Sequence, residues 1–228
     1  IEAHKIVLNP EITGKNISRF FDSDILIINI PPGRHDNVAE NHIRQINSVI
    51  MSLLKSSIKR IVFVSSTSVY GNNNKEVRES DETNPETESG KALKAAEQLL
   101  LDQSVYNPVI LRLAGLAGGD RNPGRFFAGK KQIRNGSAPV NFIHRDDCIR
   151  LIFEIVRQNV RGIFNACADL HPSRSDFYRK TAKDLGLEPP EFVNDESGSF
   201  KIINSDKIKK HIDYRFKYPD PMKFSYSD

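Results

Sequence analysis

Hydroxyl side chains cluster at the end of one apolar run in this sequence. Residues 61–64, I-V-F-V, are mostly β-branched, which is typical of a strand buried on both faces in a parallel sheet. The run stops at Ser65 and Ser66, and Ser68 follows after Thr67. Because ligands of open α/β sheets bind beyond the carboxyl ends of strands, these hydroxyls are candidates for chemistry. They could equally satisfy the backbone of a turn, so both interpretations stay open.

Three further candidates lie later in the chain. The glycine-rich loop 118–125 carries Arg121 and Arg125, which could bind a diphosphate in forked geometry. A solvated basic loop explains these arginines equally well. His144 could act as a general base, although a single histidine before a helix more often has a structural role. No metal site is expected, because the acidic cluster at 79–82 has no metal-ligand spacing and is interpreted as a solvated loop.

Apolar periodicity predicts alternating strands and helices, and therefore an α/β fold. The predicted strands cover 5–8, 25–30, 61–64, 108–113 and 162–167. The main predicted helices cover 36–57, 88–103 and 126–134, and a further helix after 147 is expected to bury Cys148, Ile149, Ile152, Phe153 and Val156 on one face.

Composition excludes several classes of protein. The chain has 228 residues and a net charge of +4 with basic and acidic residues interleaved, so we expect no nucleic-acid partner. No apolar run reaches the roughly 18 residues of a membrane span, and no signal peptide is visible. Cys148 and Cys167 are interpreted as buried thiols of a reducing compartment. These features predict a soluble, cytoplasmic protein without a membrane partner.

The stretch S-S-T-S-V-Y-G at 65–71 resembles the extended short-chain dehydrogenases/reductases, the group that contains NAD-dependent epimerases and dehydratases of nucleotide sugars. L-R-L-A-G-L-A-G-G at 111–119 and F-I-H-R-D at 142–146 are similar to later segments of that family, in the same order. The resemblance implies a Rossmann-like doubly wound parallel sheet with a small C-terminal α/β substrate-side subdomain. It implies a dinucleotide-binding domain at 1–135, and the last Rossmann elements and the substrate-side region at 136–228.

The resemblance also implies roles for individual residues. Ser66 occupies the position of the catalytic serine, which polarises the reacting oxygen. The backbone that passes the cofactor, NAD or NADP, maps to Asn29, Ile30, Pro31, Ser65, Leu113 and Leu116. The substrate side, for a nucleotide sugar or related polar metabolite, maps to Arg121, Arg125 and His144. The family often forms homodimers through helices equivalent to 36–57 and 88–103.

The helix at 88–103 departs from the family pattern. The family begins this helix with Tyr-x-x-x-Lys, in which the lysine lowers the pKa of the tyrosine general acid/base. Here Ser89 and Leu93 stand at those positions, while Gly90 and Glu97 match. Serine cannot replace that tyrosine as an acid/base near neutral pH. The acid/base is therefore unidentified, and a catalytically inactive dinucleotide-binding or scaffolding protein is the alternative.

The first βαβ unit of the family has no counterpart in these residues. Strands 5–8 and 25–30 correspond to the family's third and fourth strands, and the G-x-G-x-x-G phosphate loop is missing. In the strand order 3-2-1-4-5-6, this absence separates the third strand from the fourth and exposes an apolar edge. We expect the sequence to be a fragment that lacks roughly 50–60 residues and to bind no dinucleotide without them. The alternative is a rearranged sheet in which 5–8 pair elsewhere.

Overall fold

The computed structural model describes residues 2–33, 37–195 and 198–226. These residues form two compact units. Unit 1 comprises 1–71, 82–112 and 161–164, and unit 2 comprises 72–81, 113–160 and 165–228. The units interleave along the chain, whereas the sequence-based division placed a single boundary after residue 135. Each unit is described separately below.

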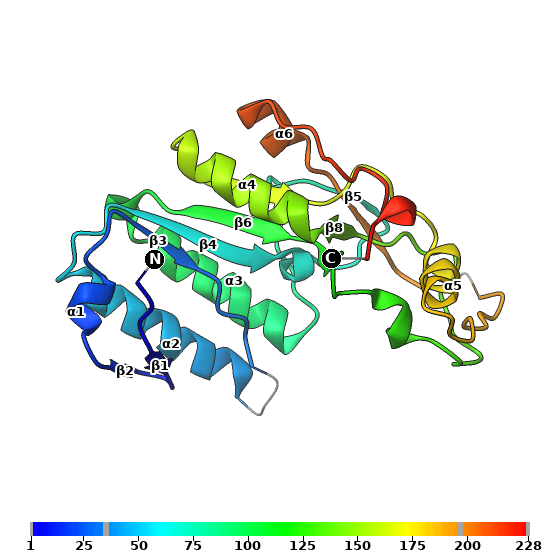
Figure 1. The fold of residues 1–228 in the computed structure, drawn as a ribbon, viewed down its shortest axis with the longest axis horizontal. Helices are drawn as coiled ribbons and strands as arrows, with labels where there is room; N and C mark the ends of the chain where they lie inside the picture. The colour runs from blue at the N-terminus through cyan, green and yellow to red at the C-terminus, as the bar shows by residue number, and fades with distance from the viewer. Residues whose placement is uncertain (1, 34–36, 196–197, 227–228) are drawn as a thin grey trace. The chain divides into compact units, whose positions relative to one another are not determined.

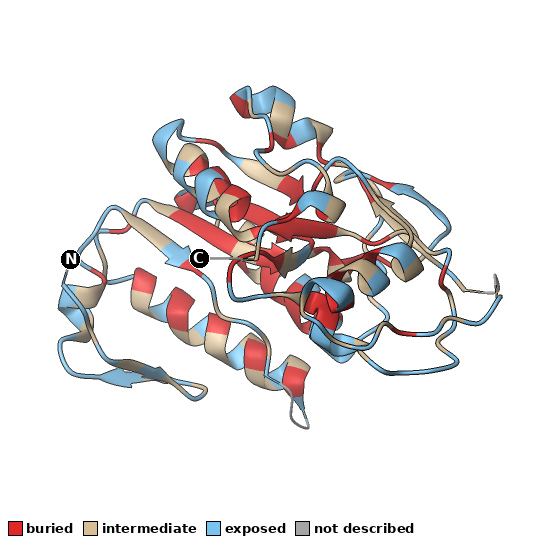
Figure 2. Cartoon of the chain, turned by 45° about the vertical axis from the view of Figure 1, so that its right-hand side comes forward, coloured by how far each residue is buried: buried red, intermediate tan, exposed pale blue. Residues whose placement is uncertain are grey.

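A four-stranded sheet organises unit 1 (Figure 1). Its order is β3 (Ile25–Ile28), β4 (Arg60–Ser66), β6 (Val109–Leu113) and β9 (Gly162–Ala166), and the last residues of β6 and β9 belong to unit 2. β3 pairs in parallel with β4, with Ile27 opposite Val62. The two inner strands are the most deeply buried, as Figure 2 shows, because apolar residues cover both faces of a parallel sheet. The predicted Rossmann-like parallel α/β fold is confirmed.

Two long helices of unit 1 pack against each other, α2 (Val38–Leu53) and α3 (Glu88–Leu101). Each buries one stripe of side chains at helical spacing, in α2 from Val38 through Ile46 to Leu53. Thr87 caps the start of α3, because its side chain accepts a hydrogen bond from the backbone N–H of Gly90. In the part of the chain described here, no helix has the length and apolar character needed to cross a bilayer.

The first residues of unit 1 lie outside the parallel sheet. β1 (Ile6–Leu8) pairs antiparallel with β2 (Ile12–Gly14), and the short helix α1 (Ile17–Phe20) follows. The predicted strand at 5–8 therefore forms, but it pairs with β2 and not with β3. This is the rearranged pairing that the sequence left open.

Unit 2 contains shorter elements around its own apolar cluster. They are β5 (Lys75–Val77), β7 (Gly115–Ala117), η3 (Pro123–Phe126), β8 (Phe142–His144), α4 (Arg145–Arg157), α5 (Arg174–Asp184), β10 (Lys201–Ile203), α6 (Asp206–Ile212) and η4 (Pro221–Lys223). β7 pairs in parallel with β8, and β5 with β10. The cluster is centred on Phe142, which stacks on Phe177 with ring centroids 4.6 Å apart.

Two sequence-based expectations for unit 2 are wrong. The helix expected at 126–134 is absent: the turn η3 ends at Phe126, and 127–134 are irregular. The expected apolar face of α4 is also misassigned, because Ile149 and Phe153 are 59% and 62% exposed. The buried stripe instead includes Cys148, Leu151 and Ile155, so this helix carries apolar side chains on two faces.

Candidate functional site

A cavity of about 820 Å³ opens in unit 1 where the strand-end serines lie. Its lining comes from the loop after β3, the end of β4 with the turn η1 (Thr67–Val69), and the beginnings of α2 and α3. The lining residues are Asn29, Pro31, Pro32, Gly33, Val38, Val64, Ser65, Ser66, Ser68, Glu88, Ser89 and Leu93. The position matches the expected ligand crevice of an open α/β sheet, beyond the carboxyl ends of parallel strands.

Ser66 is held at the last residue of β4 by its own turn. Its backbone is extended, and its Oγ accepts a hydrogen bond of 3.1 Å from the backbone N–H of Ser68. A hydroxyl that accepts one hydrogen bond keeps its own proton to donate. The Ser66 side chain can therefore donate to an oxygen atom of a ligand in the cavity.

Ser65 differs from Ser66 because its hydroxyl is engaged within the core. It donates a hydrogen bond of 2.5 Å to Oε1 of Glu97, and the residue is 4% exposed. Glu97 accepts hydrogen bonds of 2.6 and 3.1 Å from the guanidinium of Arg112, which in turn donates to the Tyr70 hydroxyl at 2.6 Å. Burial lowers the pKa of Arg112, but the hydrogen bonds and charge of Glu97 outweigh burial, and the net shift is upward. This buried network holds Ser65, and with it the end of β4, in place.

The first turn of α3 brings Ser89 and Leu93 to the same cavity as Ser66. The helix approaches the turn after β4 very closely, because a Cβ on Gly90 would lie 2.5 Å from the backbone oxygen of Ser68. Only glycine fits this approach without displacement of the backbone. Positions 66, 89 and 93 thus line one cavity.

Glu88 is the one charged side chain among the described residues that line the cavity. It is 68% exposed and forms an ion pair of 2.7 Å with Lys91, one turn along the helix. Sequence reasoning missed this residue, although it directly precedes the position of the family's tyrosine. Among the described residues, no group of His, Cys, Asp or Glu side chains could hold a metal ion.

The cavity brings together only some of the site residues that the sequence suggested. Asn29, Pro31, Ser65 and Ser66 line it, whereas Ile30 lines a different, apolar cavity. The other candidates belong to unit 2: Leu113 is buried, Leu116 is half-buried in β7, and Arg121 and Arg125 are exposed in the loop that contains η3.

His144 is buried in unit 2, with a partner at each ring nitrogen. Its Nδ1 accepts a hydrogen bond from the backbone N–H of Asp146 at 3.2 Å and thereby caps α4. Its Nε2 lies 3.1 Å from the backbone oxygen of Ser225, and its ring stacks on Tyr218 at 3.7 Å. These contacts favour an ordering role for the imidazole.

Asp147 is fully buried, and its carboxylate forms hydrogen bonds with other groups of the same chain. Its carboxylate accepts hydrogen bonds from the Tyr214 hydroxyl and from the backbone N–H groups of Lys217 and Tyr218. Burial raises the pKa of Tyr214, and the hydrogen bond to Asp147 raises it further. Asp147 therefore ties the segment after α6 to the first turn of α4.

Comparison with known proteins decides the family. The model of the NAD dependent epimerase/dehydratase family matches residues 33–167, which include the serine-rich turn, the start of α3 and β6. The chain belongs to this family. Protein YeeZ of Escherichia coli strain K12 is 38% identical over 226 residues, which cover 97% of this chain and 82% of that protein.

Solved structures show the same fold at lower sequence identity. UDP-glucuronic acid 4-epimerase from Bacillus cereus, in complex with NAD, superposes with a TM-score of 0.76 at 18% identity and covers 93% of this chain and 76% of its own. RMD from Pseudomonas aeruginosa, complexed with NADPH, has a TM-score of 0.67 at 12% identity and covers 88% and 80% of the two chains. The epimerase/dehydratase fold therefore extends over most of this chain.

Proposed function

We propose that this protein is an NAD(P)-dependent epimerase/dehydratase-like enzyme that acts on a nucleotide sugar or a related polar metabolite without the usual Tyr-Lys pair. The observation that carries this proposal is that Ser66, Ser89 and Leu93 line one cavity at the strand ends. Membership of the family and the NAD and NADPH complexes of its structural neighbours support it.

The cavity suits part of a nicotinamide dinucleotide. Its volume of about 820 Å³ lies within the usual range for small-molecule sites, and hydroxyls of Ser66, Ser68 and Ser89 can bind a ribose or a sugar. When bound, the nicotinamide would accept a hydride from a substrate carbon and return it. No lysine or arginine is found among the described lining residues, so the pyrophosphate needs donors from outside this cavity wall.

Different residues of this chain would have different roles in the reaction of the substrate. Ser66 would donate its hydroxyl proton to the reacting oxygen as a hydrogen bond, which stabilises negative charge that develops there. Since serine does not ionise near neutral pH, proton transfer needs another group. Glu88 carries the one carboxylate among the described lining residues, and we assign it that role. In unit 2, the backbone near Leu113 and Leu116 would pass the nicotinamide. Arg121 and Arg125 would bind the diphosphate of the substrate. His144 would order the chain at the start of α4.

Loss of catalysis with retained binding is the alternative. Leu93 stands, buried, at the position that the resemblance assigns to the lysine, so the described lining of the cavity lacks the cation that activates the family's phenol. A protein with this cavity could bind a dinucleotide and act as a scaffold.

Calorimetric titration separates these functions. NAD⁺, NADH, NADP⁺ and NADPH would be titrated into this chain and into a form extended at its N-terminus by a βαβ unit with a glycine-rich loop. We expect micromolar binding to the extended form only. UDP-sugars would then be screened for transient reduction of bound NAD⁺ or NADP⁺, with Ser66→Ala and Glu88→Gln as variants. Dinucleotide binding without any reduction would support the scaffold, and no binding by either form would overturn both functions.

A further inference from the structure

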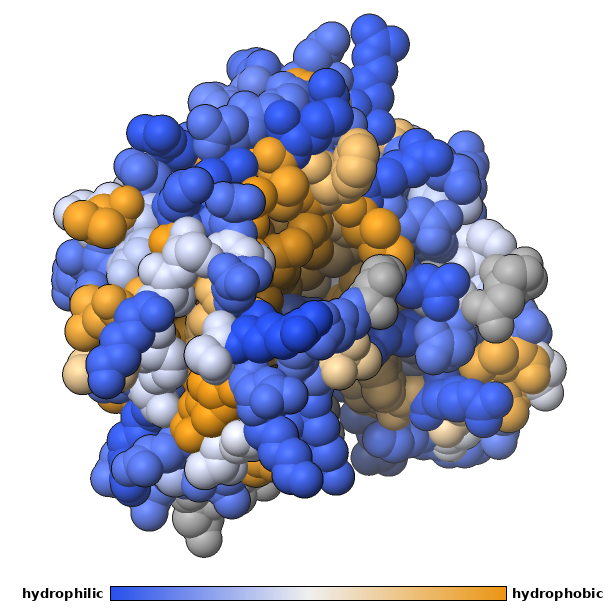
Figure 3. Space-filling model, turned by 60° about the vertical axis from the view of Figure 1, so that its left-hand side comes forward, coloured by the Kyte–Doolittle hydropathy of each residue, from blue (hydrophilic) through white to orange (hydrophobic). Residues whose placement is uncertain are grey.

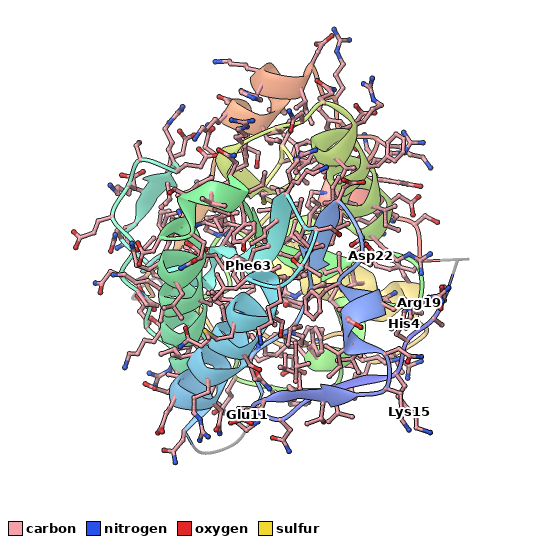
Figure 4. All side chains as sticks on the ribbon, turned by 90° about the vertical axis from the view of Figure 1, so that its left-hand side faces the viewer. His4, Glu11, Lys15, Arg19, Asp22 and Phe63 are labelled. Carbon is pink, nitrogen blue, oxygen red and sulfur yellow. The ribbon has the colours of Figure 1, made fainter. Side chains whose placement is uncertain are left out.

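The cavities of unit 1 differ in the side chains that line them. The cavity beside β3 has an apolar lining, and Figure 3, seen from the side of β3 and the β1–β2 hairpin, shows apolar side chains gathered in a hollow. Figure 4 shows charged side chains of both signs on the neighbouring segments, such as Glu11, Lys15 and Arg19. A cavity of about 580 Å³ along α3 is different, because charged side chains belong to its lining.

The cavity along α3 is cationic. Its lining comes from the segment before α3, from one side of α3, and from β6 and β9, and all of it belongs to unit 1. The lining residues are Thr83, Asn84, Pro85, Lys91, Lys94, Ala95, Glu97, Gln98, Leu101, Arg112 and Ile163. Three cations against one carboxylate leave these described residues with a net charge of +2. Such a lining favours an anionic ligand.

Arg112 keeps unused hydrogen-bond donors although it is buried. A guanidinium has five N–H groups. In Arg112, Nε contacts both carboxylate oxygens of Glu97, Nη2 donates to one of them, and Nη1 donates to the Tyr70 hydroxyl. One N–H group on each terminal nitrogen therefore has no acceptor among the described residues, while Arg112 is 4% exposed. Because an unsatisfied buried donor is costly, these groups favour an acceptor in the cavity.

Lys94 adds a second cation with donors to spare. Its Nζ donates to the backbone oxygen of Thr83 at 2.7 Å, which uses one of the three donors of an ammonium group. Lys91 pairs with Glu88, whereas Lys94 has no carboxylate partner within the described ranges. Lys91 and Lys94 are three residues apart on one helix, so both ammonium groups can contact the same ligand.

We propose that this cavity binds the phosphate group of a small polar metabolite. Phosphate oxygens accept charge-assisted hydrogen bonds from guanidinium and ammonium groups, and both kinds of donor line the cavity. The volume of about 580 Å³ lies within the usual range for small-molecule sites, so the cavity has room for more than a phosphate. The amides of Asn84 and Gln98 can contact the polar remainder of the ligand.

Two polar contacts join this cavity to the cavity of Ser66. Lys91 lines the cavity along α3, and its ion-pair partner Glu88 lines the cavity of Ser66. Glu97 lines the cavity along α3 and accepts a hydrogen bond from Ser65, which lines the other. A phosphate that attracts Lys91 would weaken the ion pair with Glu88 and thereby change the surroundings of the assigned proton-transfer group. This effect on catalysis rests on the proposed function, whereas the phosphate site itself does not.

The test measures phosphate binding without any dinucleotide, so its failure leaves the proposed function untouched. Inorganic phosphate, glycerol 1-phosphate and acetate are titrated separately into the ¹⁵N-labelled chain, with the ionic strength held constant by sodium chloride. We expect saturable amide shifts at Thr83, at Asn84 and along Lys91 to Gln98, with a Kd for glycerol 1-phosphate of about 1 mM or tighter. Inorganic phosphate should share this site with a higher Kd. A lower Kd for inorganic phosphate or for acetate would overturn the proposed ligand.

Variants of Lys94 locate the site. Lys94→Ala removes the ammonium group and should weaken binding of glycerol 1-phosphate about tenfold, whereas Lys94→Arg keeps the charge and should stay within about threefold of the parent. The matched control is Lys55→Ala, because Lys55 is an exposed lysine just after α2, outside this cavity. It should bind as the parent chain does, and circular dichroism checks that each variant folds.

Three results would overturn the proposal. The first is the absence of saturable shifts in the folded parent chain. The second is an equal Kd for the parent and Lys94→Ala. The third is a loss of affinity in Lys55→Ala as large as that in Lys94→Ala, because it would show that the anion responds only to the overall charge of the chain.

Discussion

Removal of the Glu97 carboxylate should destabilise unit 1 strongly. The Glu97 and Arg112 side chains are 4% and 5% exposed, and Glu97 receives three hydrogen bonds from Arg112 and one from Ser65. In Glu97→Ala the guanidinium stays buried with its charge uncompensated, which costs about 3–5 kcal/mol. The orphaned Ser65 hydroxyl adds about 1 kcal/mol. We expect a total loss of about 4–6 kcal/mol, a large share of the roughly 5–15 kcal/mol that stabilises a domain.

Urea denaturation followed by circular dichroism measures this loss. With a slope of about 2 kcal/mol per molar urea, the midpoint should fall by about 2–3 M. Glu97→Gln keeps the shape and one acceptor oxygen, so it should lose about half as much. The matched control is Glu191→Ala, which breaks an exposed ion pair with Lys131 and should cost less than about 1 kcal/mol. If Glu97→Ala costs no more than this control, the buried network does not hold β4 in place.

Three further outcomes follow from the geometry. Gly90→Ala should cost about 1–3 kcal/mol in urea denaturation, because its Cβ would meet the Ser68 oxygen at 2.5 Å; an unchanged midpoint would contradict the close approach. Burial raises the pKa of Cys148 to about 11, so at pH 8 about one thiol in a thousand is ionised, and iodoacetamide should label it only after denaturation. Burial lowers the pKa of His42, against a smaller upward effect of Gln45, so the folded chain binds fewer protons than the unfolded chain below the ordinary value of 6.5. The free energy of unfolding should therefore fall as the pH drops from about 7 to 5, at up to about 1.4 kcal/mol per pH unit, and His42→Leu should reduce this slope; an equal slope would refute burial as its cause.

Local signals in the sequence were enough to locate the strand-end serines. A β-branched run that ends at Ser65 and Ser66 predicts a buried parallel strand, and β4 is that strand. Such features depend on a few neighbouring residues and need no knowledge of distant contacts.

Features that depend on distant contacts were not predictable. Glu97 appeared in the sequence only as a family match, and its role arises because Arg112, 15 residues away, points at it from β6. Apolar residues recur at helical spacing on two faces of α4. Hydrophobic periodicity alone therefore could not predict which of the two faces is buried. The apolar composition of β3 predicted burial along the whole strand, whereas Ile27 is 46% exposed.

The most direct test of the central claim maps where a dinucleotide binds. NADH would be titrated into ¹⁵N-labelled chain that carries an added N-terminal βαβ unit, and amide chemical shifts would be followed in the parent and in Ser66→Ala. We expect saturable shifts at Asn29, at Ser65 to Ser68 and at Glu88 to Leu93, and none of comparable size at the apolar face of α4. Shifts that saturate elsewhere while these residues stay unperturbed would contradict the assignment of the cavity as the cofactor site.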